Sequence, residues 1–203
     1  FWKYLDNAIN SERIRRGREV MAKHQKTLRK IASRYGVQPR FITAFWGLES
    51  NYGKHTGVFP VLGAVATLAF DPRRSRFFRG QLLAALTIMN RGDVDFWVKG
   101  SWAGAMGNFQ FIPTTYRDFA VDGDGDGKRD MWNSFPDMFA SAANYLSHSC
   151  WPPGWTSGRA VQLPQAFRLA LTGLTSRKPP SQWPALRVPR LGGGGLPTPD
   201  STA

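Results

Sequence analysis

Apolar residues recur every three or four positions through most of the first 150 residues, a spacing typical of amphipathic α-helices. One stripe runs from Ser11 to Tyr35 and ends at Gly36, a residue type that commonly stops a helix. The segment 41–50 (FITAFWGLES) is the most apolar helix-like stretch, and Pro39 can occupy its first turn. Further helices are predicted at about 62–70, 75–90, 113–119 and 134–147. The pattern therefore predicts a mainly α-helical fold.

The pattern weakens after Trp151, where prolines and a run of four glycines (192–195) interrupt it. Only the segment Gln165–Leu171 retains a helical pattern there. We therefore expect a compact helical domain over residues 1–151 and a loop-rich extension over 152–203, with little to pack against in its tail.

Composition limits the classes of protein that fit. The 203-residue chain is 42% hydrophobic, which is globular rather than disordered in character. No apolar run approaches the roughly 20 residues of a membrane-spanning helix. The chain begins at Phe1 without a Met or a signal peptide, so it reads as a processed or trimmed fragment. The lone Cys150 excludes an intramolecular disulfide.

The net charge of +13 is concentrated near the start of the chain, where residues 1–40 hold eleven Lys/Arg and three Asp/Glu, so 11 − 3 = +8. Such a surface suits a polyanion, either nucleic acid, an anionic lipid face or a carboxylate-rich cell-wall polymer. Zinc-finger spacing, aromatic RNA-binding strands and basic-zipper heptads are all missing from the sequence, so we expect no nucleic-acid partner.

Glu49 is one of three glutamates in the chain, and it lies at the end of the apolar 41–50 segment. On a helix it shares a face with Ile42, Phe45 and Trp46. An acid beside apolar neighbours loses hydration, which raises its pKa toward the range that a general acid requires near neutral pH. A glutamate that merely ends a helix and points to water fits the same spacing, so both readings stay open at this point.

Residues 99–112 (KGSWAGAMGNFQFI) are rich in glycine and also carry aromatic and amide side chains. This composition predicts a loop that forms the wall of a binding cleft. Because the segment lacks the Lys-Ser/Thr ending of a phosphate-binding loop, it does not predict nucleotide binding.

The segment 122–133 resembles an EF-hand calcium loop. Aspartates occupy its first, third and fifth positions, Gly127 the sixth, and Lys128 can offer its main-chain carbonyl from the seventh. Hard oxygen ligands favour Ca²⁺ as the bound ion. Position twelve is Asn133, where a bidentate Glu is usual, so Asp137 can supply the last carboxylate; it can equally serve a capping box with Ser134.

Three stretches together resemble the B-type lytic murein transglycosylases, a family of bacterial cell-wall enzymes. They are 45–53 (FWGLESNYG), 100–113 (GSWAGAMGNFQFIP), and the acidic loop followed by Asn144-Tyr145. Residues 1–6 and 70–74 are also similar, so the resemblance covers roughly residues 1–151. It implies a lysozyme-like helical catalytic domain that cleaves the β-1,4 bond between N-acetylmuramic acid and N-acetylglucosamine in peptidoglycan.

The resemblance also implies roles for individual residues, beginning with Glu49 as a single catalytic acid/base. It implies substrate contacts in the cleft from Ser101, Gln110 and Tyr145, and contacts to stem-peptide carboxylates from Arg73 and Arg74. It implies a structural calcium site made of Asp122, Asp124, Asp126, Lys128 and Asp137, and no organic cofactor. Further sugar-stacking candidates, each equally readable as core, are Tyr52, Trp102 and Phe109.

Glycoside cleavage generally needs an acid and a second carboxylate, and no second carboxylate stands out around the cleft motifs. The resemblance accounts for this, because the C6 hydroxyl of muramic acid would then attack C1 and leave a 1,6-anhydromuramoyl end. The expected partners are peptidoglycan strands and other cell-wall enzymes in the periplasm, with outer-membrane association only through an upstream lipid anchor.

One feature departs from the family. Its members continue into a segment with a Tyr-Asn pair that closes the cleft, and nothing after Trp155 matches it. A non-catalytic peptidoglycan-binding domain is therefore the alternative function.

Overall fold

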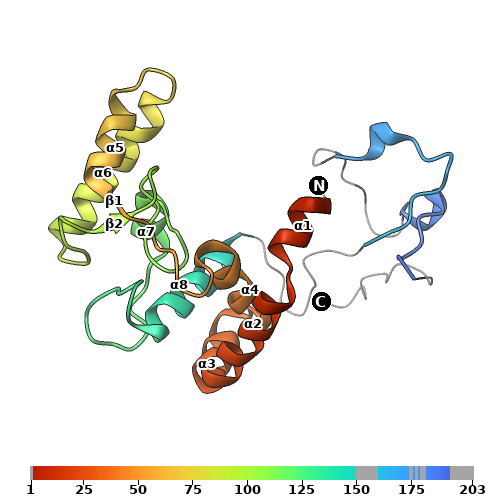
Figure 1. Cartoon of the computed structure of the whole chain (residues 1–203), viewed down its shortest axis with the longest axis horizontal. Helices are drawn as coiled ribbons and strands as arrows, with labels where there is room; N and C mark the ends of the chain where they lie inside the picture. The colour runs from red at the N-terminus through yellow and green to blue at the C-terminus, as the bar shows by residue number, and fades with distance from the viewer. Residues whose placement is uncertain (1, 150–159, 174–175, 177, 179–181, 193–203) are drawn as a thin grey trace. The chain divides into compact units, whose positions relative to one another are not determined.

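The computed structural model describes residues 2–149, 160–173, 176, 178 and 182–192. The chain divides into two compact units, residues 1–154 and 155–203. The first unit is mainly helical, as predicted (Figure 1). Its elements are α1 (Trp2–Ala8), α2 (Ser11–Lys23), α3 (Gln25–Tyr35), α4 (Pro39–Ser50), β1 (Phe59–Pro60), α5 (Val61–Phe70), α6 (Ser75–Asn90), β2 (Lys99–Gly100), α7 (Pro113–Phe119) and α8 (Phe135–His148).

Local sequence signals determine several of the helix ends. Proline lies in the first turn of α4 and of α7, where its missing N–H costs nothing. Gly36 ends α3 with a left-handed φ of 71°. Asn51 ends α4 in the same region, with φ 51°. These signals place Glu49 in the last turn of α4, next to the chain reversal that follows it.

The stripe predicted over residues 11–35 is broken in the structure, because α2 ends at Lys23 and α3 starts at Gln25. The residue between them, His24, has φ −104° and ψ 18°, outside the helical range. The two helices have different main partners, since α2 packs chiefly against α4 and α3 chiefly against α8. The break also lets the His24 ring lie 4.0 Å from that of Phe135. Tertiary packing therefore overrides a continuous local pattern.

The helix predicted at Gln165–Leu171 is wrong, because only the short 3₁₀ turn η1 (Leu169–Leu171) forms there. None of its residues is buried, and Leu169 is 72% exposed. A short helix is marginal in water without an apolar surface to cover. A second turn, η3 (Pro184–Leu186), completes the described elements of this unit, and the expected boundary at residues 151/152 lies outside the described residues.

The core of the first unit surrounds α4, whose Ile42 and Trp46 are buried. Residues from α8 pack against this face, with Phe139 lying 5.4 Å from the Trp46 ring. Aromatic residues from the 99–112 segment, Phe109 and Phe111, complete the cluster. Nowhere in the described part of the chain is a helix both long and apolar enough to span a bilayer.

Candidate functional site

Glu49 lies on the last turn of α4, at the exposed end of a helix face whose other members are buried or half-buried. A helical side chain leans toward the preceding turn, so that of Glu49 leans toward Phe45. The Phe45 ring packs 5.0 Å from Phe109 and 6.1 Å from Tyr145. The acid thus stands at the edge of an aromatic cluster, where its side chain is partly desolvated and still accessible.

Loss of hydration raises the pKa of the Glu49 carboxyl above its ordinary value, as the sequence predicted. No charged neighbour contributes to this shift. Within the described residues, no hydrogen bond or ion pair holds the carboxyl in place. An acid with a raised pKa keeps its proton to higher pH than an ordinary glutamate, so one such group can both donate and accept a proton without a paired carboxylate.

Asn108 connects the helix that carries Glu49 to the rest of the site. Its Oδ1 accepts a hydrogen bond from Trp46 Nε1 at 2.8 Å. Its Nδ2 donates to the carbonyls of Met131 (3.1 Å) and Trp132 (2.9 Å), at the end of the acidic loop. The side chain is 5% exposed, so these bonds form in a protected environment. The prediction of site residues did not include Asn108, because its partners lie 62, 23 and 24 residues away.

The glycine-rich segment lies directly against the turn that follows α4. Gly57 has φ 98°, and a Cβ there would lie 1.9 Å from the carbonyl carbon of Gly100. Only glycine permits this approach between the two backbones. The pairing of β1 with β2 is consistent with this close approach, since Phe59 of β1 pairs with Gly100 of β2. The glycine-rich segment therefore packs against the turn that follows the Glu49 helix, and its role as a cleft wall stays a prediction.

Gln110 and Ser101 shape this wall. Gln110 Nε2 donates to Thr56 O (3.2 Å) and Gly107 O (3.0 Å), which ties the wall to the turn after α4. Its backbone has φ 50°, an uncommon conformation for a residue other than glycine. Ser101 Oγ accepts from the amides of Ala103 (3.3 Å) and Ala105 (3.0 Å), which leaves its O–H as a donor.

Burial assigns two of the sugar-stacking candidates to the core. Tyr52 is 8% exposed, fits against Gly17 and Gly47, and donates from its hydroxyl to Arg13 O at 2.9 Å. Phe109 is 1% exposed. A sugar face cannot stack on a ring that the protein already covers, so these two residues belong to the hydrophobic core.

Two other aromatic candidates remain accessible. Trp102 is 66% exposed on the glycine-rich wall. Tyr145 is half-buried on α8, where its ring contacts Phe45, Phe111 and Phe119. A sugar stacks on an exposed ring face, so both rings stay candidates for that role.

Arg73 and Arg74 lie in the turn between α5 and α6, and no hydrogen bond or ion pair among the described residues joins them to Glu49 or to the wall. Arg73 instead binds Asp71, with its Nε 3.0 Å from both carboxylate oxygens. Arg74 lies over the ring of Phe77 at 4.6 Å. Their assignment to stem-peptide carboxylates stays a prediction.

The acidic loop gathers oxygen atoms at one point. Carboxylate oxygens of Asp122, Asp124, Asp126 and Asp137 all lie within 4.8 Å of one another. Ligands at opposite sides of a bound Ca²⁺ are about 4.6–5.2 Å apart, from a Ca–O distance of 2.3–2.6 Å. The loop backbone supports this geometry, since Gly125 N and Gly127 N donate to Asp122 at 2.6 and 2.8 Å. The donor set therefore fits Ca²⁺, whereas the Lys128 carbonyl as a ligand stays a prediction.

Asp137 was predicted either to cap a helix with Ser134 or to supply a carboxylate to the acidic loop, and its different atoms fit both. Its backbone N donates to Ser134 Oγ at 3.3 Å, which caps α8. Its carboxylate turns to the loop and accepts from the amides of Gly123 and Asp130, each at 2.7 Å. Asn133 at position twelve is turned away, because its N–H and Nδ2 both donate to Asp130.

The fold and the site have counterparts among known proteins. The family model "Transglycosylase SLT domain" matches residues 1–203. Membrane-bound lytic murein transglycosylase B of Escherichia coli (strain K12) is 34% identical over 87% of this chain and 53% of its own length. SltB3 of Pseudomonas aeruginosa is 48% identical with a TM-score of 0.91, over 97% of this chain and 53% of that one, in complex with NAG-NAM-pentapeptide.

A second SltB3 structure contains NAG-anhNAM-pentapeptide. Escherichia coli Slt35 in complex with calcium is 32% identical with a TM-score of 0.80, over 93% of this chain and 60% of that one. The chain thus spans about half the length of the first of these relatives.

Proposed function

This chain belongs to the transglycosylase SLT domain family, and we propose that it is a lytic transglycosylase acting on peptidoglycan strands in the bacterial periplasm. The observation that carries the proposal is Glu49, an acid whose pKa is raised by loss of hydration alone. It stands beside the wall formed by residues 99–112. The ligands of SltB3, one with a muramoyl sugar and one with its anhydro form, support this substrate class.

In the proposed reaction, protonated Glu49 donates its proton to the glycosidic oxygen as the bond from that oxygen to C1 breaks. The C6 hydroxyl oxygen of the muramoyl sugar attacks C1 from within the same residue. The Glu49 carboxylate takes the proton of that hydroxyl, which returns the acid to its starting state. One carboxyl group thereby serves both half-steps, so neither an activated water nor a second carboxylate is required.

The other site residues would hold the sugar rather than react. The Ser101 hydroxyl and the free Oε1 of Gln110 offer one donor and one acceptor on the wall. The rings of Trp102 and Tyr145 offer surfaces for sugar faces. Asp122, Asp124, Asp126 and Asp137 would hold a Ca²⁺ that neutralises their charge and fixes the loop to which Asn108 is bonded.

Replacing the acid tests the proposal. We expect Glu49→Gln to slow release of anhydromuropeptides from murein sacculi by about 10³-fold, the middle of the range for removal of a general acid. Glu19→Gln, the same chemical change on exposed α2, serves as the control and should leave the rate unchanged. Mass spectrometry of the soluble products identifies the anhydro ends.

The same digest separates the alternative, a peptidoglycan-binding domain without activity. Binding of the unmodified chain to sacculi with no soluble product would establish that alternative. Release of products with free reducing ends would indicate hydrolysis instead. Turnover of Glu49→Gln at the unmodified rate would exclude Glu49 as the acid.

A further inference from the structure

The turn between α5 and α6 forms an exposed end of the first unit. The two helices pack against each other as a hairpin, and the turn 71–74 lies at the end remote from β1 and β2 (Figure 1). We call residues 70–79 the hairpin tip. It comprises the end of α5, the turn, and the first turns of α6.

The hairpin tip carries a concentrated positive charge. It contains four arginines and a single acid, Asp71. Arg73 lowers the pKa of Asp71 to about 2 by hydrogen bonding, so Asp71 stays ionised and neutralises that arginine. Among the described residues, no carboxylate lies within ion-pair distance of the other three, Arg74, Arg76 and Arg79.

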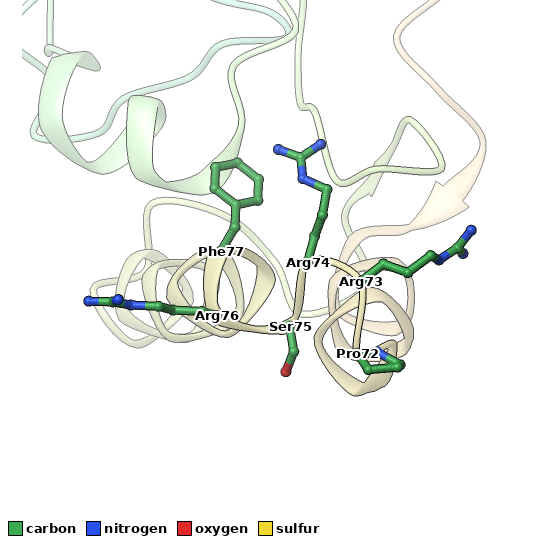
Figure 2. Close-up of a pocket in the computed structure, with 6 residues that line it drawn as sticks. All are labelled: Pro72, Arg73, Arg74, Ser75, Arg76 and Phe77. Atoms are coloured by element: carbon green, nitrogen blue, oxygen red, sulfur yellow. The ribbon is translucent and has the colours of Figure 1, made fainter.

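Apolar side chains are exposed among these charges. Phe70 is 91% exposed and Phe77 is 41% exposed. An open hollow of about 540 Å³ is lined by residues 72–77. In Figure 2, Arg74 and Phe77 extend toward the same side of this hollow, while Arg73 and Arg76 extend to opposite sides. The ten residues of the tip thus combine two exposed aromatic rings with four arginines.

We propose that the hairpin tip docks on the surface of an anionic phospholipid bilayer. The Phe70 ring would enter the headgroup region, and Arg76 and Arg79 would bind lipid phosphates. Guanidinium groups bind phosphate through paired hydrogen bonds, and aromatic rings favour the boundary between headgroups and acyl chains. A small carboxylate ligand would use the arginines alone and leave Phe70 in water, whereas a bilayer accommodates both features.

Vesicle binding tests this proposal with a charge-matched control. Arg76→Gln with Arg79→Gln should weaken binding to vesicles containing about one-third phosphatidylglycerol by about 30-fold, from the contribution of each arginine near an anionic surface. Lys26→Gln with Lys30→Gln removes the same charge from exposed positions on α3 and should weaken binding less than about threefold. Equal losses in the two pairs would overturn the proposal, because they would indicate attraction by net charge alone.

A probe at the tip tests the geometry directly. In a chain with Cys150→Ser, an environment-sensitive fluorophore attached at Phe70→Cys should brighten and shift to shorter wavelength on the anionic vesicles. The same fluorophore at Lys26→Cys should not change. No change at position 70 would overturn the proposal. The double variant Arg76→Gln with Arg79→Gln supplies a second contradicting outcome. If it loses binding to peptide-bearing murein but keeps its binding to vesicles, the proposal is overturned, because these arginines would then bind peptide carboxylates.

Discussion

At the scale of single residues, the proposed reaction makes activity depend on the protonation of Glu49 and therefore on pH. Loss of hydration raises the pKa of this acid, so the protonated form persists to higher pH than for an ordinary glutamate. We expect kcat/KM for murein to fall about tenfold per pH unit above the raised pKa. The pH–rate profile of the digest measures this. A profile that breaks at the ordinary glutamate pKa would contradict the assigned environment.

The raised pKa of Glu49 also makes the stability of the fold depend on pH. Because the folded pKa of Glu49 exceeds the unfolded one, the folded state binds more protons between the two values, and stability falls as pH rises through that window. The glutamine side chain in Glu49→Gln does not titrate, so this variant lacks that pH dependence. Its melting temperature should therefore exceed that of the unmodified chain above the window and converge with it below. Parallel curves of melting temperature against pH would refute this.

Asn108 has a structural rather than a chemical role. Asn108→Ala would remove the hydrogen bonds of the buried Trp46 Nε1 and of the Trp132 carbonyl, while Met131 O would keep its bond from the backbone N–H of residue 108, so we expect a loss of about 3 kcal/mol in the free energy of unfolding. This corresponds to a melting temperature lower by roughly 10 °C. Asn90→Ala at an exposed helix end is the control, with an expected loss below about 0.5 kcal/mol. Equal melting temperatures for the two variants would show that Asn108 does not hold the site together.

These residues show what a single sequence reveals. The apolar neighbours of Glu49 are local, so spacing offered a raised pKa as one of two readings, and desolvation in the structure supports that one. The burial of Tyr52 depends on Gly17 and Gly47, which lie 35 and 5 residues before it and admit the ring. The hydrogen bonds of Asn108 likewise join distant segments. Contacts of this kind are determined by tertiary packing, which periodicity does not encode.

At the scale of elements, the acidic loop predicts a response to calcium. Four carboxylates within 4.8 Å repel one another until a cation neutralises them. We expect Ca²⁺ at about 100 times its dissociation constant to stabilise the chain by about 2.7 kcal/mol, or roughly 5–10 °C in melting temperature. Mg²⁺ should have a smaller effect, because it demands shorter bonds and octahedral geometry.

A double variant of the acidic loop tests whether the calcium response depends on its carboxylates rather than on the shape of the loop. Asp124→Asn with Asp126→Asn keeps the shape of both side chains and removes half of the clustered charge. With a chelator present this variant should melt at or above the temperature of the unmodified chain, and added Ca²⁺ should no longer raise it. Differential scanning calorimetry compares the two. A calcium shift that survives in the variant would place the ion elsewhere.

Elements with strong local signals were predictable to the residue. Pro113 starts α7 as expected, because proline in the first turn is a short-range signal, and α6 spans Ser75–Asn90 as its apolar spacing predicted. The break at His24 was not predictable, since the apolar stripe continues through it and the cause lies in the different partners of α2 and α3. The helix predicted at Gln165–Leu171 did not form, because a short helical pattern needs an apolar surface to pack against.

At the scale of the whole molecule, the core determines which part of the chain folds by itself. All described residues of the main hydrophobic cluster and of its half-buried surround lie between Val20 and Leu146. We therefore expect a chain of residues 1–154 to melt cooperatively within about 2 °C of the 203-residue chain and to keep its calcium response. A chain ending at Ser134 is the contrast. It lacks α8, which buries Met138 and Phe139 against the Glu49 helix and supplies the fourth carboxylate of the loop, so it should not fold. Loss of the cooperative transition in the 1–154 chain would mean that residues after 154 contribute to the stability of the first unit.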